Sequence, residues 1–131
     1  MTVRTACRRR HPRIQMTPGD EARVEFGWPR PTGHPCSMEM KDLSAGGVSF
    51  RLAHDLPGLE VGDSIRRVTL RVRGREIHCD LLVMHLTPDH TRGSVCGAFV
   101  YPRDDEDILA LQGLVAELEA ELPPGERGGN S

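Results

Sequence analysis

The feature that most constrains this chain is an alternation of apolar and polar residues that recurs from Ala22 to about Tyr101. A period of two places successive side chains on opposite faces of a strand, so each alternating run predicts a strand with one buried face and one wet face. Two later runs are more continuously apolar, which indicates strands that lie deeper. The predicted strands are residues 22–28, 37–41, 48–52, 67–73, 76–87 and 93–101.

Turn-forming residues separate these runs, and no helical pattern lies between them. Proline and glycine recur in residues 29–35, 56–58, 61–63, 73–75 and 87–89. Strands joined only by short turns pair antiparallel, and a small all-β domain removes its edge strands by closing on itself. The sequence therefore predicts an all-β fold, a six-stranded antiparallel β-barrel.

The end of the chain has a different period. Apolar residues at 108, 111, 115, 118 and 122 form one helical stripe. Asp104 is suited to cap the first turn, and Pro123-Pro124-Gly125 ends the helix. We expect a helix over residues 104–122 that packs against the barrel, with a dimer through this helix as the alternative to a monomer.

A chain of 131 residues is long enough for one core but not for two. We therefore expect a single domain over residues 1–122. It comprises a mobile arginine-rich arm at 1–13, the barrel at 14–103 and the helix at 104–122. Residues 123–131 are polar and glycine-rich, which predicts a disordered tail.

Charge is distributed unevenly although the formal net charge is only −2. Residues 1–13 hold five arginines and no acid, whereas residues 104–126 hold eight acids and no Lys or Arg. A basic arm favours an anionic ligand. Because the net charge is negative and aromatic residues are few, nucleic acid is a poor candidate for that ligand.

The four cysteines give no framework for a disulfide or a metal site. Cys7, Cys36, Cys79 and Cys96 form no C-x-x-C pair, and neither His34-x-Cys36 nor His78-Cys79 has zinc-knuckle spacing. No secretory segment precedes them and no apolar run is long enough to span a membrane. We expect a cytoplasmic protein with reduced, buried and inert thiols.

Two short motifs carry the functional information. The first is Arg8-Arg9-Arg10-His11-Pro12-Arg13, and the second is Asp42-Leu43-Ser44-Ala45-Gly46-Gly47 between two predicted strands. Taken singly, the first is typical of a solvated arm and the second of a tight turn or bulge. Taken together they offer arginine forks for phosphate and for the O6/N7 edge of guanine, acceptors at Asp42 and Ser44, and space at Gly47.

The ordered pair Arg9-x-x-x-Arg13 and Asp42-x-Ser44-x-x-Gly47 resembles the signature of the PilZ domain, the bacterial receptor module for cyclic di-GMP. The resemblance extends over essentially the whole chain, because that family also has a six-stranded β-barrel followed by a helix. One departure is in the last strand, where relatives carry Gly-x-x-Phe. Here Gly97-Ala98-Phe99 is one residue tighter, which leaves the register of that strand open.

The resemblance implies a ligand-binding site and no catalysis. It assigns Arg9 and Arg13 to guanine and phosphate, and Asp42, Ser44 and Gly47 to the other side of the ligand. In relatives an arginine at the position of Arg8 accompanies a stacked pair of cyclic di-GMP molecules, so we expect two ligands per chain; Arg10 is a further candidate contact.

The function expected from the sequence is that of a cyclic di-GMP sensor. Its arm becomes ordered on ligand binding, and the changed surface is presented to an unidentified partner protein. No catalytic set of residues is recognisable, so we do not expect an enzyme. The alternative is a PilZ-type interaction domain that is independent of nucleotide, although such relatives usually lose the arginines.

Overall fold

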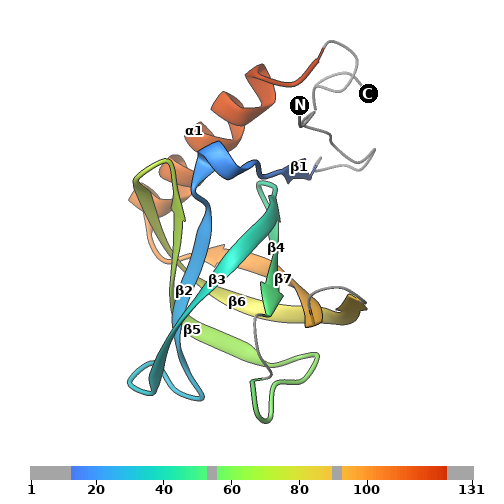
Figure 1. Ribbon diagram of the computed structural model, residues 1–131. Coiled ribbons are helices and arrows are strands. Elements are labelled where there is room, and N and C mark those ends of the chain that lie inside the picture. Colours follow the sequence, from blue (N-terminus) through green and yellow to red (C-terminus); the bar gives the residue numbers. More distant parts are fainter. Residues whose placement is uncertain (1–12, 53–55, 90–92, 124–131) are drawn as a thin grey trace.

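The computed structural model describes residues 13–52, 56–89 and 93–123. Within these ranges the chain forms seven strands, one short 3-10 helix and one α-helix (Figure 1). In chain order they are β1 (Ile14–Gln15), η1 (Pro18–Asp20), β2 (Arg23–Trp28), β3 (His34–Leu43), β4 (Gly47–Leu52), β5 (Ser64–Val72), β6 (Arg75–Asp89), β7 (Gly93–Pro102) and α1 (Asp105–Ala120).

Six of the strands close into an antiparallel barrel. Their order around the barrel is β2-β5-β6-β7-β4-β3, and β3 closes it because its first half pairs with β2 and its last residues pair with β4. The strand β1 lies outside this ring and pairs with the end of β3 that β2 does not reach. The predicted six-stranded barrel with one C-terminal helix is confirmed.

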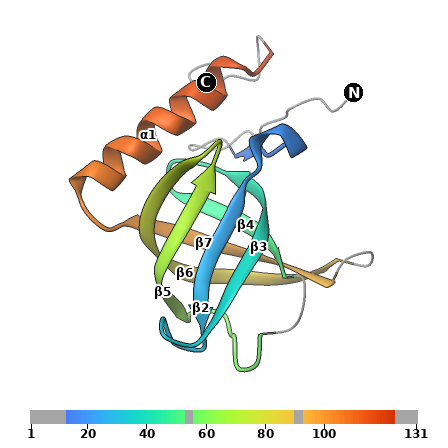
Figure 2. The same cartoon turned by 60° about the vertical axis from the view of Figure 1, so that its left-hand side comes forward.

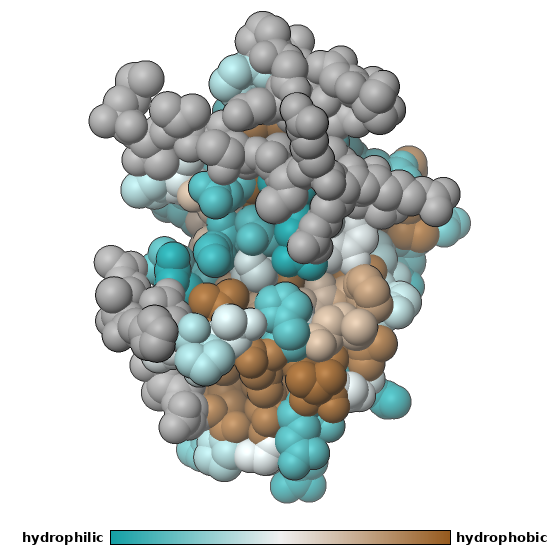
Figure 3. All heavy atoms as spheres, turned by 90° about the vertical axis from the view of Figure 1, so that its right-hand side faces the viewer, coloured by the Kyte–Doolittle hydropathy of each residue, from teal (hydrophilic) through white to brown (hydrophobic). Residues whose placement is uncertain are grey.

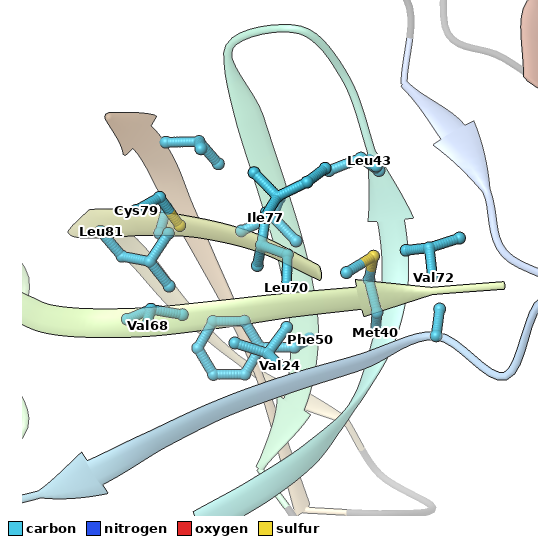
Figure 4. Close-up of a cluster of buried hydrophobic side chains, with 14 of the residues drawn as sticks. Val24, Met40, Leu43, Phe50, Val68, Leu70, Val72, Ile77, Cys79 and Leu81 are labelled. Atoms are coloured by element: carbon cyan, nitrogen blue, oxygen red, sulfur yellow. The ribbon is translucent and has the colours of Figure 1, made fainter. Parts of the chain in front are cut away.

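The barrel interior is filled by the apolar halves of the alternating strands. Figure 4 shows side chains from several strands, among them Val24, Phe50, Leu70 and Ile77, converging on one core. Val24, Phe50, Leu70 and Ile77 are completely buried, and their neighbours along each strand are exposed or half-buried, except for the buried Ser49 on β4. Period-two patterning therefore predicted which side chains form the core, because every strand has the barrel interior on one face.

Strand boundaries differ from the prediction where proline or backbone irregularity hid the pattern. The strand β3 begins at His34, inside a segment predicted as a turn, because His34 pairs with Trp28 across the β2–β3 ladder. The strand β5 begins at Ser64 and is interrupted by a register shift between Ile65 and Val68. A bulge breaks the alternation locally, so the pattern recovered only the second part of β5.

The helix α1 packs against the barrel at the end where β1 and η1 lie (Figures 1 and 2). Asp104 caps it by accepting a hydrogen bond from Asp107 N, as predicted. The predicted stripe is confirmed except at Ile108, which is 39% exposed, and the completely buried Leu114 joins it. The predicted place of Ile108 is filled by Asp107, which is held in the interface by a hydrogen bond from His78 N.

The register of β7, which the sequence left open, is given by its ladders with β4 and β6. Gly97 pairs with Ser49 on β4 and with His85 on β6. A side chain at Gly97 would overlap the imidazole of His85. Glycine at this position therefore lets the ring of His85 lie across β7.

No helix of the described residues is long and apolar enough to cross a membrane.

Candidate functional site

The short strand β1 brings the first motif to the second. Ile14 pairs with Leu43 and Gln15 pairs with Asp42, while Met16 N donates a hydrogen bond of 2.9 Å to Lys41 O. Ile14 is completely buried, so it fixes β1 to the core. Arg13 immediately precedes this anchored pair of residues, and the side chain of Arg13 therefore lies beside the end of β3.

The carboxylate of Asp42 is incompletely satisfied. Its Oδ1 lies 3.6 Å from Arg13 Nη1, which is an ion pair but is beyond hydrogen-bond reach. This oxygen is buried and has no hydrogen-bond partner among the described residues. The ladder between β3 and β4 shifts register between Met40 and Asp42, and such a bulge redirects the side chain. A buried acceptor without a donor is rare in folded proteins and indicates a place where a donor belongs.

The serine of the second motif is used differently from the sequence interpretation. That interpretation placed Asp42 and Ser44 on one strand, projecting together, but β3 ends at Leu43. The hydroxyl of Ser44 accepts from Gly46 N at 3.3 Å and from Gly47 N at 3.0 Å, and it donates to Gly47 O. Ser44 therefore organises the β3–β4 turn, which is the local role that the sequence also allowed.

Gly47 leaves space for other groups to approach. A Cβ atom there would lie 3.2 Å from Ala98 O, 3.7 Å from Arg13 Nη2 and 3.7 Å from Ser44 Oγ. Its backbone is not in the left-handed region. The glycine is thus needed because a strand and a guanidinium come close, and not because of an unusual φ. Arg13, Asp42, Ser44 and Gly47 are all brought together at one end of the barrel.

The structure adds Phe99, which the sequence analysis did not assign to the site. Phe99 pairs with Gly47 across the β4–β7 ladder and is 44% exposed. Paired residues project to the same face of a sheet, so the ring lies on the outer face beside the space that the guanidinium of Arg13 occupies. An exposed aromatic residue on an alternating strand was the available signal, but the apolar run over 93–101 hid which of its residues face outward.

Figure 3 shows hydrophobic residues gathered over the lower part of the barrel on the face turned to the viewer, with hydrophilic residues above them. The site combines a cation, a buried acceptor and an exposed aromatic ring. Such a set binds planar, hydrogen-bonding anions. Arg8, Arg9 and Arg10 lie outside the described residues.

The thiols and histidines form no second site among the described residues. No group of three or more His, Cys, Asp or Glu side chains there is placed to hold a metal ion. Cys36, Cys79 and Cys96 are free thiols, and burial raises the pKa of both Cys79 and Cys96 to about 12. Cys79 and Cys96 are therefore buried as expected and stay protonated at neutral pH, whereas Cys36 is half-buried rather than buried. Cys7 lies outside the described residues.

The family can now be assigned. The sequence profile of the PilZ domain matches residues 8–117, which include both motifs, the barrel and most of α1. The chain belongs to the PilZ domain family. Among curated proteins, none matches this PilZ domain.

Three solved structures illustrate how widely this fold is shared. The complex of MrkH from K. pneumonia with c-di-GMP superposes with a TM-score of 0.71 at 19% identity, covering 88% of this chain and 54% of that one. The Bacillus subtilis inhibitor of motility MotI has a TM-score of 0.66 at 18% identity, covering 87% and 52%. The PilZ domain of Escherichia coli YcgR with c-di-GMP has a TM-score of 0.60 at 18% identity, covering 88% and 94%.

These likenesses concern the fold. The chain spans about half the length of MrkH and MotI but nearly all of the isolated YcgR domain, at 54%, 52% and 94% respectively. The similarity thus corresponds to one PilZ domain within the longer relatives.

Proposed function

We propose that this PilZ domain binds cyclic di-GMP at the site formed by Arg13, Asp42, Ser44 and Gly47, together with Arg8, Arg9 and Arg10. The observation that carries the proposal is the buried Oδ1 of Asp42, which lies beside a guanidinium but has no hydrogen-bond partner. A ligand with N–H donors and a negative charge satisfies both groups at once. Three of the solved structures similar in fold are complexes with c-di-GMP, which supports the choice of ligand.

Guanine fits the acceptor at Asp42. The N1–H and N2–H groups of guanine are adjacent donors, and a carboxylate can accept both. The guanidinium of Arg13 carries donors for a phosphate or for O6 and N7. The ring of Phe99, exposed beside Gly47, offers a face on which a base can stack. Ser44 holds the turn that keeps Asp42 and Gly47 in place.

Ligand choice provides the first test, by calorimetric titration with cyclic di-GMP, cyclic di-AMP and GTP. Adenine lacks the N1–H donor and presents an amino group where guanine has O6. Each buried mismatch costs about 1–3 kcal/mol, so cyclic di-AMP is expected to bind at least about tenfold more weakly. Equal affinity for the two dinucleotides would contradict guanine recognition. Absence of any cyclic di-GMP binding would favour the alternative, an interaction domain independent of nucleotide.

Arg8 bears on stoichiometry. Two stacked cyclic di-GMP molecules bring four phosphates, and the run Arg8-Arg9-Arg10 with Arg13 supplies four guanidinium groups. We therefore expect two ligands per chain, and we expect Arg8→Leu to shift the ratio towards one while part of the affinity is retained. Saturation of the parent protein at one ligand per chain would contradict this expectation.

The output of binding is an ordered arm. Because five arginines close together repel one another, a ligand that neutralises them allows residues 1–13 to settle on the barrel. Hydrogen exchange of these residues is expected to slow when ligand is added, and the free energy of unfolding is expected to rise by about 2.7 kcal/mol at one hundred times Kd. The surface so changed is presented to a partner protein. An arm that exchanges slowly without ligand would instead be structural.

A further inference from the structure

A second arginine, Arg73, joins three parts of the molecule that are far apart in sequence. It lies in the two-residue turn between β5 and β6, since Val72 pairs with Arg75. Its Nε donates a hydrogen bond of 2.9 Å to Oδ1 of Asp20, the last residue of η1. Its Nη1 and Nη2 donate hydrogen bonds of 2.6 and 2.7 Å to the two carboxylate oxygens of Glu121, at the end of α1.

Asp20 belongs to the same short segment as Arg13. The carboxylate of Asp20 is 1% exposed and accepts from Thr17 N at 2.8 Å and from Thr17 Oγ1 at 3.1 Å. Its carbonyl accepts from Arg73 N at 2.9 Å. Residues 13–20, called here the anchor segment, are therefore held at both ends. One end is the loose pair with Asp42 at the ligand site, and the other is the tight pair with Arg73.

The backbone of Arg73 indicates that its side chain is required at this position. Its φ is 53°, and Gly74 after it has a φ of 79°. A turn with two left-handed residues favours Asn, Asp or Gly at its first position, and a long side chain there is strained. Strain of this kind persists where the surrounding contacts hold it, and here those contacts are the two carboxylates.

The helix provides an independent indication. Glu117 and Glu121 are four residues apart, so they repel each other on an isolated helix, and both lie at its negative end. No basic residue occupies the last turn of α1. The compensating charges come from the barrel: Arg73 contacts both acids, and Arg75 Nη2 donates 2.9 Å to Glu117. The last turn of α1 is therefore electrostatically favourable only when it is docked on the β5–β6 turn.

We propose that Asp20, Arg73 and Glu121 form a coupling clamp, through which order in the anchor segment and docking of the C-terminal half of α1 stabilise each other. Loss of either carboxylate leaves the guanidinium with fewer partners and leaves the remaining pair strained. A ligand that fixes Arg13 therefore tightens α1, and by reciprocity a partner that holds α1 tightens the ligand site. This last step rests on the proposed function, whereas the clamp itself does not.

The clamp is tested first without ligand, by hydrogen exchange. Arg73→Met is expected to accelerate exchange about tenfold in residues 14–22 and in residues 115–122 alike. Arg71→Met is the matched control, because Arg71 lies two residues earlier on β5 and pairs with Glu25 and Glu76, neither of which is on α1. Acceleration confined to α1 would overturn the proposal, because Arg73 would then only hold the helix.

A variant on the helix side avoids any change in the strained turn. Glu121→Gln is expected to accelerate exchange in residues 14–22, although none of these residues touches position 121 through a described hydrogen bond. Glu119→Gln removes the same charge from the same helix without a described contact to Arg73 and is expected to leave that segment unchanged. Equal effects of the two variants would mean that charge alone, and not the clamp, is responsible.

Cyclic di-GMP then tests transmission from the ligand site. In the parent protein the ligand is expected to slow exchange in residues 115–122 about fivefold or more, the lower range of allosteric coupling. In Glu121→Gln the ligand still binds, but this slowing is lost. Slowing that persists in Glu121→Gln would overturn transmission through the clamp. A parent protein that does not bind ligand would contradict the proposed function alone, because the ligand-free comparisons still decide whether the clamp couples the two segments.

Discussion

Two arginine–aspartate pairs hold the ends of the anchor segment, and they differ in distance, in burial and in hydrogen bonding. Arg73 and Asp20 are 2.9 Å apart, and the aspartate is 1% exposed with its oxygens fully bonded. Arg13 and Asp42 are 3.6 Å apart, the aspartate side chain is 14% exposed, and its buried Oδ1 lacks a hydrogen bond. The first pair is complete, whereas the second lacks a partner.

The difference separates structure from function. A saturated buried pair stabilises the folded chain only as long as both members remain, because removing one leaves an uncompensated charge. An unsaturated pair contributes little to folding and retains bonding capacity for a ligand. Functional sites commonly keep such groups at some expense in stability. The comparison therefore assigns Asp20 to the fold, and it supports the proposal that Asp42 binds the ligand.

The largest expected effect is on folding, at the complete pair. Asp20→Ala is expected to lower the free energy of unfolding by at least about 2 kcal/mol, because Thr17 N and Arg73 Nε each lose their acceptor, at about 1–3 kcal/mol per lost hydrogen bond. Asp42→Ala is expected to stay within about 1 kcal/mol of the parent, since it removes an acceptor that has no donor. Urea denaturation of both variants measures the contrast. Equal losses would remove the distinction between the two pairs.

The next effect is on binding, at the incomplete pair. The double variant Arg9→Ala, Arg13→Ala is expected to bind cyclic di-GMP at least about one hundredfold more weakly, because two charge-assisted contacts of roughly 1.5 kcal/mol each are lost. Its unfolding free energy should remain near that of the parent. Rising salt should weaken ligand binding by the parent protein more than ligand binding by the variant. Arg30→Ala, an exposed arginine in the β2–β3 loop, is the control. A double variant that binds like the parent would contradict the proposed site.

Glycine substitutions sharpen the comparison on a smaller scale. Gly47→Val is expected to cost about 1–3 kcal/mol, because its Cβ would lie 3.2 Å from Ala98 O. It should also weaken binding, since the guanidinium of Arg13 must move. Gly113→Ala is the control: nothing lies within 4 Å of the added atom, and alanine in a helix gains up to about 1 kcal/mol. Denaturation and titration of the same two variants separate packing from binding. If Gly47→Val bound the ligand as well as the parent does, the guanidinium of Arg13 would not bind it beside Gly47.

The smallest effect is expected from a third aspartate, Asp107, which resembles Asp20 in being satisfied. Burial by itself raises the pKa of Asp107, but hydrogen bonds involving His78 N and Asp104 outweigh burial and lower it. Because the folded pKa lies below the unfolded value, the stabilisation is present above about pH 4 and is lost as the pH falls through the folded pKa. The unfolding free energy of Asp107→Asn should therefore depend less on pH in this acidic range. An unchanged acid dependence would contradict the role of these bonds.

The sequence predicted the fold because the information needed was local. Alternation along each strand and the stripe along the helix depend on neighbours in the chain, and both are recognisable without tertiary contacts. The stripe was nevertheless placed one position off at Ile108, since Asp107 reaches the interface through a hydrogen bond from another strand. The start of β3 was missed because Pro35 is typical of a turn when only its neighbours in the chain are considered.

The candidate site was only partly predictable. Arg13, Asp42 and Gly47 were recognised from the spacing of two motifs, and the structure brings them together. The turn-forming role of Ser44 was one of two readings that the sequence could not separate. Phe99 was missed, because the pairing of β7 with β4 decides which residue lies beside Gly47.

By itself the sequence determined a closed barrel, a terminal helix and two motifs, one rich in arginine and one of Asp, Ser and Gly. All of these come from patterns a few residues long. Only the tertiary structure decided that Arg73 hydrogen-bonds two carboxylates, whereas Arg13 lies 3.6 Å from the carboxylate of Asp42. Arg13 and Arg73 are alike as residues, and neither the aspartate that each one meets nor the distance to it is encoded nearby in the chain. Those aspartates lie up to 53 residues away along the chain and are brought close by the barrel. Charge complementarity over such separations depends on how the whole core packs.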